Sequence, residues 1–506
     1  MKVVFWIFLA VSLGLGIYYL SGAGSEKVDF GGNAIETNVA EDPPVEFTAT
    51  LPGYGDPGNT TPEPTETPGI PRKTPRATKS PKASKSPQGG QNQILTLPYL
   101  SRVPIAVRDR GKSGVMTYKE KECYDGLNLY ASKWRSEARL MDMRGKVVHR
   151  WAIDSNNEWQ NTVVDPQGNL YFLEVGVRVG KLDWYSNYLW TNDREFHHWI
   201  DIAKNGDIYT LIWDKYELQY DNRLVPALTD FLAVLSPKGE MKKAISVYEL
   251  LGSQIPKKRL KTLSESVYMT QQNMPPMPGG DFDLFHTNTI VKIERDIPGL
   301  CKKGDMLICV RQLDTVAIVD PDRKKVLWQW GPGVLSMSHS PVLLDNNNIL
   351  VFDNGTVEKH FSRIVEVDPF TKKIVYEYKG NPPQDFYTVE AGAVQALPNG
   401  NMLITESNRG KVFEVTRSGK VVWEFYNPDI ESNQRSTIFR MTRLDKALSE
   451  KLLKKVKKDE SSMPGQQMPG QQMPGQQMQG QQMPGQQMPG QMPGQQMPPG
   501  PGPGGF

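Results

Sequence analysis

In the 506-residue sequence, three histidines and one arginine are spaced so that together they could bind and transfer an anionic group. His198, His286 and His339 each stand at the start of a short apolar run, and Arg311 lies in the next run after that of His286. A neutral imidazole can attack an anionic ester as a nucleophile, while an arginine and further imidazoles neutralise the charge that develops on its oxygens. Arginine suits this second role because its planar guanidinium stays charged and matches two oxygens at once.

Other interpretations of these residues stay open at the level of sequence. Imidazole is the commonest protein ligand of metal ions, so the three histidines could instead form the metal site of an oxygenase or hydrolase. A single histidine on a strand is more often structural than catalytic, but three at matching places of a repeat favour a functional site. The other histidines are predicted to be structural or solvated. His197 is expected to point away from His198, and His149 and His360 lie in an outer hairpin and a loop.

The candidate residues belong to a repeat that organises the middle of the chain. A hairpin of two strands joined by a tight polar turn recurs six times, starting at residues 141, 182, 235, 319, 367 and 415. Its longest interval contains a polar, Pro- and Met-rich excursion around residues 249–283. Ahead of most hairpins lies a turn Gly or Asn and another apolar strand, as in KNGDIYTLIW. Four strands per unit and six units predict an all-β fold, a six-bladed β-propeller.

The repeat also predicts where the histidines lie. In a propeller the innermost strand of each blade lines a central channel, and its side chains alternate between the channel and the neighbouring blade. Counting back eight residues from the turn residues Gly206 and Asn347 gives His198 and His339. A longer connection follows His286, but HTNTIVKI has the pattern of the same strand. We therefore expect these histidines to face one channel, with Arg311 fixed in an adjacent strand.

The beginning of the chain differs in composition from the repeats. Residues 1–23 contain the uncharged run VVFWIFLAVSLGLGIYYL after Lys2, which predicts a transmembrane signal anchor or a cleaved signal peptide. In either case the rest of the chain is expected on the periplasmic or extracellular face, and an anchor would make the membrane a partner. Residues 24–95 are rich in Pro, Thr, Ser and Lys, which is typical of a disordered tether.

The end of the chain shows a second change in composition. Within the predicted propeller of residues 96–443, the stretch that begins at residue 436 is predicted to complete a blade where the ring closes. Residues 444–460 combine apolar residues at helical spacing with a basic face, which predicts a surface helix. Residues 461–506 repeat MPGQQ, which predicts a disordered, low-complexity tail.

Net charge and cysteine content limit the partners and the disulfide bonds that we expect. A formal net charge of +3 gives no reason to expect a nucleic-acid partner. Three cysteines are too few for a disulfide scaffold. Cys301 and Cys309 flank a KKGD turn, where either one bridge or two buried thiols would fit the sequence.

Residues 120–430 resemble the arylsulfotransferase (arylsulfate sulfotransferase) family, which folds as a six-bladed propeller. The likeness is carried by His198 before a KNG turn, by the His-x-Asn sequence that starts at His286, by Arg311, and by His339 ahead of FDNG and SRIVEVD. The best-known bacterial members have a folded N-terminal β domain in front of the propeller, where this chain has the tether.

The resemblance implies transfer of a sulfuryl group from a phenolic sulfate ester to a phenol, through a sulfohistidine intermediate and without a nucleotide donor, cofactor or metal. By position His339 resembles the family's nucleophile, and His198, His286 and Arg311 resemble the residues that bind and polarise the sulfate. The resemblance implies substrate-binding or supporting roles for Asn288, Asp353, Asn354 and Arg363, with pairing inside a blade as the alternative role of Arg363. The second interpretation of the whole chain is a catalytically silent propeller, tethered at the cell surface as a binding module.

Overall fold

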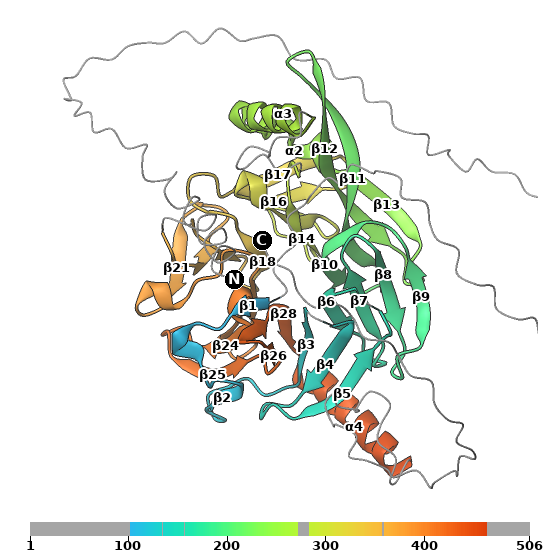
Figure 1. The fold of residues 1–506 in the computed structure, drawn as a ribbon, viewed down its shortest axis with the longest axis vertical. Coiled ribbons are helices and arrows are strands. Elements are labelled where there is room, and N and C mark those ends of the chain that lie inside the picture. Colours follow the sequence, from blue (N-terminus) through green and yellow to red (C-terminus); the bar gives the residue numbers. More distant parts are fainter. Residues whose placement is uncertain (1–101, 134, 156, 272–282, 357–358, 463–506) are drawn as a thin grey trace, which may run out of the picture. The chain divides into compact units, whose positions relative to one another are not determined.

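The computed structural model describes residues 102–133, 135–155, 157–271, 283–356 and 359–462 (Figure 1). The predicted signal or membrane segment, the predicted tether and nearly all of the predicted tail lie outside these ranges, and the predicted boundaries of these segments stay predictions. Each helix in the described ranges is too short or too polar to cross a membrane.

Six antiparallel sheets make up most of the described chain, and each contains at least three strands that follow one another in sequence. Sheet 1 consists of β28 (Ile438–Arg443), β3 (Asn128–Ser132), β4 (Glu137–Met141) and β5 (Val147–Ala152). Sheet 2 consists of β6 (Trp159–Val164), β7 (Leu170–Glu174), β8 (Arg178–Leu182) and β9 (Tyr188–Asn192). Sheet 3 consists of β10 (Phe196–Ile202), β11 (Ile208–Tyr220), β12 (Arg223–Leu235) and β13 (Met241–Ser246).

The second half of the chain continues the pattern. Sheet 4 consists of β14 (Thr287–Lys292), β15 (Met306–Val310), β16 (Thr315–Asp320) and β17 (Lys325–Trp330). Sheet 5 consists of β18 (His339–Leu343), β19 (Ile349–Asp353), β20 (Arg363–Val367) and β21 (Ile374–Lys379). Sheet 6 consists of β22 (Ala393–Ala396), β23 (Met402–Glu406), β24 (Lys411–Val415) and β25 (Val421–Tyr426), with β2 (Gly114–Tyr118) as a fifth strand.

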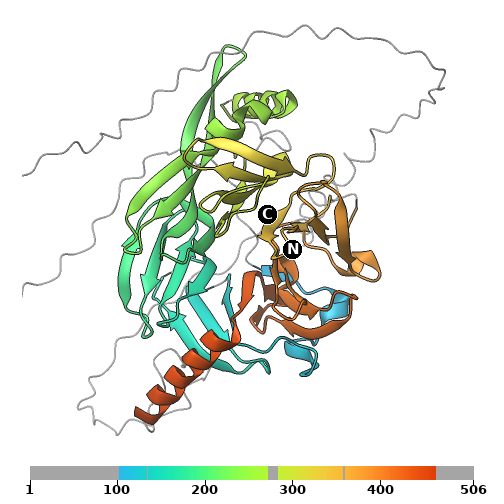
Figure 2. The same ribbon diagram turned by 180° about the vertical axis from the view of Figure 1, so that it is seen from behind.

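The first strands of the six sheets contact one another in cyclic order. β6 contacts β10, β10 contacts β14, β14 contacts β18, β18 contacts β22, and β28 contacts both β22 and β6. Figures 1 and 2 show the sheets following one another around a common centre. The prediction of a mostly β chain with propeller-like, antiparallel sheets is therefore confirmed. β28 pairs with β3, so the stretch after residue 436 completes the first unit as predicted.

Short polar turns explain why the hairpins form where the sequence predicts them. In the first hairpin the Asp142 carboxylate accepts hydrogen bonds of 2.9 Å from the backbone N–H groups two and four residues later. Gly145 has a φ of 87°, in the left-handed region that glycine adopts most easily. Asp165 and Asp183 form the same bonds in the next turns. A short polar turn therefore fixes the register of each hairpin.

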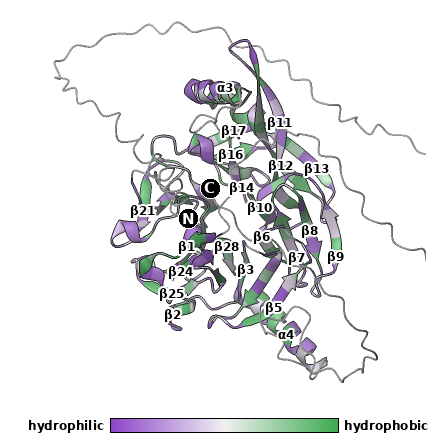
Figure 3. Ribbon diagram, in the orientation of Figure 1, coloured by the Kyte–Doolittle hydropathy of each residue, from purple (hydrophilic) through white to green (hydrophobic). Residues whose placement is uncertain are grey.

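Apolar side chains of neighbouring sheets pack against each other. Between sheets 4 and 5, Leu307 and Val316 share a buried cluster with Val351 and Val365. β7, β15, β19 and β23 are buried along their whole length. Figure 3 shows this hydrophobic character along the strands, while α3 (Lys257–Gln271) carries a hydrophilic stretch. Polar residues buried at the ends of the inner strands are therefore the exceptions that need an explanation.

Two helices and a long hairpin extend sheet 3. β11 and β12 pair over 13 residues, well beyond the length of the other strands. α2 (Val247–Leu251) and α3 follow β13, and Leu251 and Leu263 pack in the same buried cluster as Leu218 and Val225 of the hairpin. The helices occupy most of the polar excursion that the sequence indicated around residues 249–283.

α4 (Lys446–Ser462) lies where the sequence predicted a surface helix. Its N-terminus is capped by Asp445, which accepts a hydrogen bond of 2.8 Å from the backbone of Leu448. Leu452 and Val456 pack into the core between sheets 1 and 2.

The cysteines Cys123, Cys301 and Cys309 are free thiols, so the alternative of a Cys301–Cys309 bridge is wrong.

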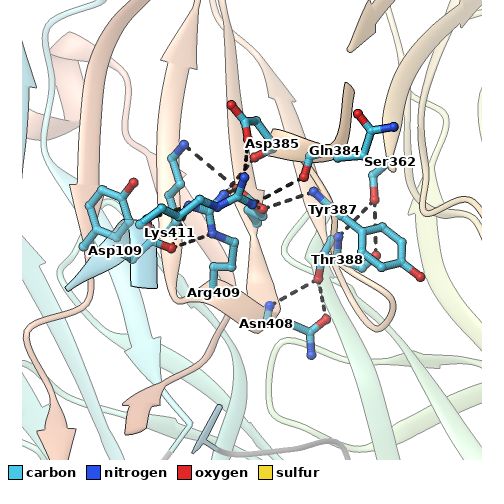
Figure 4. Close-up of polar contacts among 12 residues, drawn as sticks. Asp109, Ser362, Gln384, Asp385, Tyr387, Thr388, Asn408, Arg409 and Lys411 are labelled. Carbon is cyan, nitrogen blue, oxygen red and sulfur yellow. Dashed lines mark hydrogen bonds and ion pairs between the residues drawn. The ribbon is translucent and has the colours of Figure 1, made fainter. Parts of the chain in front are cut away.

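A segment ahead of the first sheet binds to sheet 6 through ion pairs. The turn η1 (Val107–Asp109) places the buried carboxylate of Asp109 2.7 Å from Arg409, whose guanidinium also contacts Glu406 at 3.0 Å (Figure 4). Burial raises the pKa of Asp109, but its bonds to Arg409 outweigh that effect and hold the pKa below its ordinary value. Glu406 and Asn408 in turn bind the backbone of Tyr387 and the hydroxyl of Thr388. This network fixes the loop that precedes β22.

Candidate active site

In sheets 3, 4 and 5 the first strand is irregular at its start. The pairing of β10 with β11, of β14 with β15 and of β18 with β19 shifts register within the first residues of β10, β14 and β18. His198, His286 and Ser340 have φ values of 60°, 50° and 50° at these places. Side chains other than glycine adopt this left-handed conformation rarely, and it is concentrated at functional sites. The bulges turn the neighbouring histidines out of the regular strand alternation.

The structure brings the four predicted catalytic residues together. The rings of His198 and His286 lie 4.8 Å apart between centroids, with an interplanar angle of 71°. Burial lowers the pKa of His198 well below its usual value, and the neighbouring side chains of His286, His339 and Arg311 lower it further. Residues from three sheets that are distant in sequence therefore share one electrostatic environment. A cluster of imidazoles beside a guanidinium can bind a tetrahedral anion and stabilise charge on its oxygens.

Arg311 does not lie in a strand as the sequence predicted. It opens the turn η3 (Arg311–Leu313) directly after β15, and its backbone N–H donates to the carbonyl of His286 at 3.3 Å. Its Nη2 donates to the sulfur of Met337 at 3.2 Å, which is a weak acceptor. Its buried Nε has no hydrogen-bond partner among the described residues. The guanidinium is thus held at the site, while its Nε–H bonds to no acceptor among the described residues.

His339 is oriented by two acceptors on one side of its ring. Nδ1 lies 2.7 Å from the Oδ1 of Asn354 and 2.9 Å from the carbonyl of Met337. The orientation of the Asn354 amide is fixed because its Nδ2 donates to the carbonyls of Thr388 and Ala391, at 2.9 and 2.5 Å. Two acceptors at Nδ1 require the proton there, so Nε2 carries the lone pair. This buried Nε2 has no hydrogen-bond partner in the described part of the chain.

His339 is also kept neutral. Burial lowers its pKa to about 3, with the positive charge of Arg311 as the second cause. At neutral pH its Nε2 lone pair is therefore available to attack an electrophile. A proton on Nδ1 and an acceptor behind it stabilise the positive charge that the ring gains in such an attack, as in other oriented imidazoles.

His286 is held by an acidic side chain, Asp283, that was not among the predicted site residues. The Nδ1 of His286 lies 2.8 Å from the Oδ2 of Asp283, and the backbone N–H of His286 donates to Oδ1 of the same carboxylate at 2.8 Å. Burial raises the pKa of Asp283, but the interaction with His286 outweighs it and lowers the pKa below the ordinary value. An ionised Asp283 therefore fixes the ring of His286.

The predicted supporting residues bond to protein groups around His339. Asn288 donates to the carbonyl of Ser338 at 2.8 Å. Asp353 accepts from the Arg363 Nε at 2.7 Å and from the backbone N–H of Ser336 at 2.8 Å, and Arg363 also pairs with a glutamate of β21. These bonds brace the loop ahead of β18. The prediction that Asn288, Asp353 and Arg363 contact substrate stays a prediction, whereas Asn354 contacts the ring of His339 itself.

Two further residues of the site were missed at the level of sequence. His197 was expected to turn away from His198, but its Nδ1 lies 2.7 Å from the Nδ1 of His198, so that expectation is wrong. Its ring stacks on Trp213 with 4.3 Å between centroids. Asp230 lies 3.6 Å from the other nitrogen of His197. No repeat position flagged Asp230, since it lies within the long β12 strand and not at the start of a unit.

Lys133 is a cation at the equivalent place of sheet 1. It follows β3 seven residues after the turn glycine of its unit, as Arg311 follows β15 in sheet 4 and Asn354 follows β19 in sheet 5. It is 5% exposed, and burial lowers its pKa to about 8 against the opposing charges of Glu158 and Glu390. The repeat count applied to this strand end would have found it in the sequence.

The arrangement defines a mostly β, propeller-like protein with a histidine and arginine site at the ends of its inner strands. Among the described residues no group of three or more His, Cys, Asp or Glu side chains is placed to hold a metal ion. Residues 189–428 match the model of the family described as arylsulfotransferase (ASST). The resemblance predicted from His198, His286, Arg311 and His339 is therefore confirmed, and this part of the chain is an arylsulfotransferase-family domain. A comparison with curated proteins finds no match.

Several solved structures are similar in part. A protein of unknown function from Bacteroides caccae has 14% identity and a TM-score of 0.42, over 63% of this chain and 98% of that one. Streptogramin B lyase has 12% identity and a TM-score of 0.37, over 68% and 98% of the two chains. The WD40 β propeller domain of Doa1 has 13% identity and a TM-score of 0.38, over 67% and 98%.

The buried histidines predict that stability falls in acid. Burial lowers the pKa values of His149, His197 and His339 to about 4, 3 and 3, whereas in the unfolded chain they protonate near 6.5. Between these values the unfolded state binds more protons, so the free energy of unfolding decreases as pH falls. Each histidine contributes up to about 1.4 kcal/mol per pH unit.

Denaturant unfolding followed by tryptophan fluorescence at pH 7.5 and pH 5 measures this effect. The midpoint is expected to be clearly lower at pH 5, and His149→Gln should remove about one histidine's share of the pH dependence. Equal midpoints at both pH values would contradict the prediction.

Proposed function

We propose that the six sheets are the blades of one six-bladed propeller, and that the protein is an aryl sulfotransferase acting through a sulfohistidine on His339. The observation that carries this proposal is the orientation of His339. Asn354 and Met337 accept from its Nδ1, so a neutral ring directs an Nε2 lone pair into the cluster that contains Arg311. The arylsulfotransferase-family domain over residues 189–428 supports the class of reaction.

The first half of the reaction would form the covalent intermediate. The Nε2 lone pair of His339 attacks the sulfur of an aryl sulfate, the bond between sulfur and the aryl oxygen breaks, and the electron pair leaves with the phenolate. Arg311, His198 and His286 neutralise charge on the three remaining sulfuryl oxygens. The ring gains positive charge as the N–S bond forms, and the acceptor groups of Asn354 and Met337 at Nδ1 stabilise it.

The second half reverses the first with another phenol. The oxygen of the acceptor phenol attacks the sulfur, its proton passes to a base, and the N–S bond breaks so that His339 recovers its lone pair. No nucleotide or cofactor takes part in either half. Donor and acceptor are small aryl molecules in this proposal, and neither half involves nucleic acid.

We further propose that the propeller works on the exported side of a membrane. The proposal rests on the uncharged run that follows Lys2, which is followed by a Pro- and Lys-rich segment suited to a tether.

Mass spectrometry of the protein mixed with para-nitrophenyl sulfate tests the proposed function. We expect the mass of one SO₃ group on the peptide that contains His339, analysed without acid treatment, and a burst of nitrophenolate equal to the protein concentration. Addition of phenol should remove the label and yield phenyl sulfate. An unlabelled protein that releases no nitrophenolate would overturn the proposal and favour the silent binding module.

A further inference from the structure

We infer that His197 and Asp230 are positioning residues that fix which nitrogen of His198 carries its proton, and so make His198 a hydrogen-bond donor to the sulfuryl oxygens. The inference deepens the proposed function and rests on it for the identity of the anion. It concerns two residues to which neither the family resemblance nor the repeat assigns a role. Both are fully buried next to the site.

The backbone and ring of His198 are held from the neighbouring elements. Its backbone N–H donates to the Oε1 of Gln160 at 2.8 Å, and its carbonyl accepts from the Nδ2 of Asn161 at 3.1 Å. These bonds come from sheet 2 and stabilise the left-handed backbone of His198. Its Nδ1 lies 2.7 Å from the Nδ1 of His197, a distance that requires one hydrogen between the two nitrogens. One ring must therefore donate and the other must accept.

The surroundings of His197 identify it as the donor. The Nε2 of His197 has no hydrogen-bond partner among the described residues, so the contact with His198 at Nδ1 is the hydrogen bond that its ring makes there. A proton on this buried Nε2 would lack an acceptor, and a buried donor without an acceptor is costly. The hydrogen of His197 therefore lies on Nδ1. The pKa of His197 is lowered to about 3 by burial, so the ring holds no second proton at neutral pH.

Asp230 completes this arrangement as a protonated acid. Its Oδ2 accepts from the backbone N–H of Thr287 at 2.5 Å, and its Oδ1 faces the Nε2 of His197 at 3.6 Å. Burial raises the pKa of Asp230 well above its ordinary value, and the nearby Asp283 carboxylate raises it further. Two close buried carboxyl groups cannot both ionise easily, and Asp283 is the ionised one because it pairs with His286. A proton on Asp230 matches the lone pair on Nε2 of His197.

The result is a defined donor at the site. Because His198 accepts at Nδ1, its own proton lies on Nε2, and burial keeps the ring neutral. An N–H group stabilises an anionic oxygen, whereas the other tautomer would direct a lone pair at it. A single donor of this kind contributes about 10²- to 10³-fold to the rate of a reaction that builds charge on oxygen.

Two substitutions separate this arrangement from its alternative. Asp230→Asn keeps the shape, an acceptor for Thr287 and a donor toward His197, so kcat/KM should fall only about three- to tenfold, the cost of exchanging one buried hydrogen-bonding group for another. If Asp230 instead acted as an ionised carboxylate that binds a protonated His197, the same change would cost about 10⁴-fold, as for a triad aspartate. His197→Phe keeps the stacking on Trp213 but removes the donor to His198, and should lower kcat/KM about 10²-fold.

Nitrogen NMR of protein labelled in its histidine rings reads the tautomer directly. In wild type and in Asp230→Asn, His198 should show an unprotonated Nδ1 and a protonated Nε2 at pH 7, and His197→Phe should change this pattern. A protonated Nδ1 on His198, or a 10⁴-fold loss in Asp230→Asn, would overturn the inference. The spectrum needs no turnover, so it distinguishes failure of this inference from failure of the proposed sulfotransfer. If His197→Phe does not fold, the spectrum and rate of Asp230→Asn still decide.

Discussion

Replacing His339 with asparagine is expected to reduce sulfuryl transfer by at least about 10⁴-fold, since loss of an activated nucleophile removes the covalent route entirely. The variant should also form no labelled peptide with para-nitrophenyl sulfate. Its fold should persist, because the strand pairing of β18 depends on backbone bonds and the lost Nε2 makes no hydrogen bond within the described residues. Steady-state assays with an aryl sulfate and a phenol, with circular dichroism of the same sample, measure both effects.

A second buried histidine provides the matched control. His149 of β5 stacks on Trp184 at 3.5 Å between centroids and bonds to its carbonyl, in the contact between sheets 1 and 2. His149→Gln removes an imidazole of similar burial outside the site, so transfer should stay within about twofold of wild type at pH 7.5. Comparable activity of His339→Asn and His149→Gln would exclude His339 as the nucleophile.

The sequence predicted the repeated part of the fold because that part has local causes. Each hairpin is set by a short polar turn that opens on an Asp, Ser or Thr visible in the sequence, and its strands are largely apolar. β2 of sheet 6 could not be predicted in this way. It pairs with β25, about three hundred residues later in the chain, and neither its sequence nor its spacing repeats. The long β11–β12 hairpin was missed for a similar reason, since its extension packs against helices that occur in one unit alone.

The residues of the candidate site were likewise predictable where the sequence carries a local or repeated signal for them. His198 and His339 were found because they recur at one count from a turn, and Arg311 because it follows the next strand. Its turn conformation was missed, since the residues after Val310 carry no glycine or proline to signal the end of the strand. Asp230 was missed because its role depends on a tertiary contact with His197. Asp283 lies only three residues before His286, so its contact with that ring is local and the sequence did hold a signal for it.

The ion-pair network of Figure 4 connects the site to a part of the chain that is distant in sequence. The carbonyl of Thr388 accepts from the Asn354 amide that orients His339, and the hydroxyl of Thr388 bonds to Asn408 at 2.5 Å. Arg409 of the same turn binds Asp109, far back in the sequence. The segment before the first sheet therefore supports the loop on which the orientation of His339 depends. From sequence alone, this segment is placed only within the predicted propeller of residues 96–443.

Arg311→Met is expected to lower kcat/KM for an aryl sulfate donor by about 10³-fold, because it removes a charged clamp on the transferred group. Methionine has a similar length and fits beside Met337, so folding should be retained. The substitution also removes the positive charge that, after burial, does most to lower the pKa of His339. That pKa should rise toward its ordinary value, and the acid limb of the kcat/KM profile should move to higher pH.

The pH profile distinguishes an electrostatic clamp from a structural arginine. Arg417→Met is a suitable control, since Arg417 stacks on Tyr376 and pairs with Glu366 on sheet 5, and it should leave both rate and profile unchanged. Arg311→Lys should recover part of the rate, because an ammonium restores the charge without the planar fork. It should also return the acid limb toward the wild-type position, since the pKa of His339 responds to charge. An Arg311→Met variant that keeps full activity and the wild-type acid limb would contradict the proposed site, because the sulfuryl group would then have to bind away from Arg311.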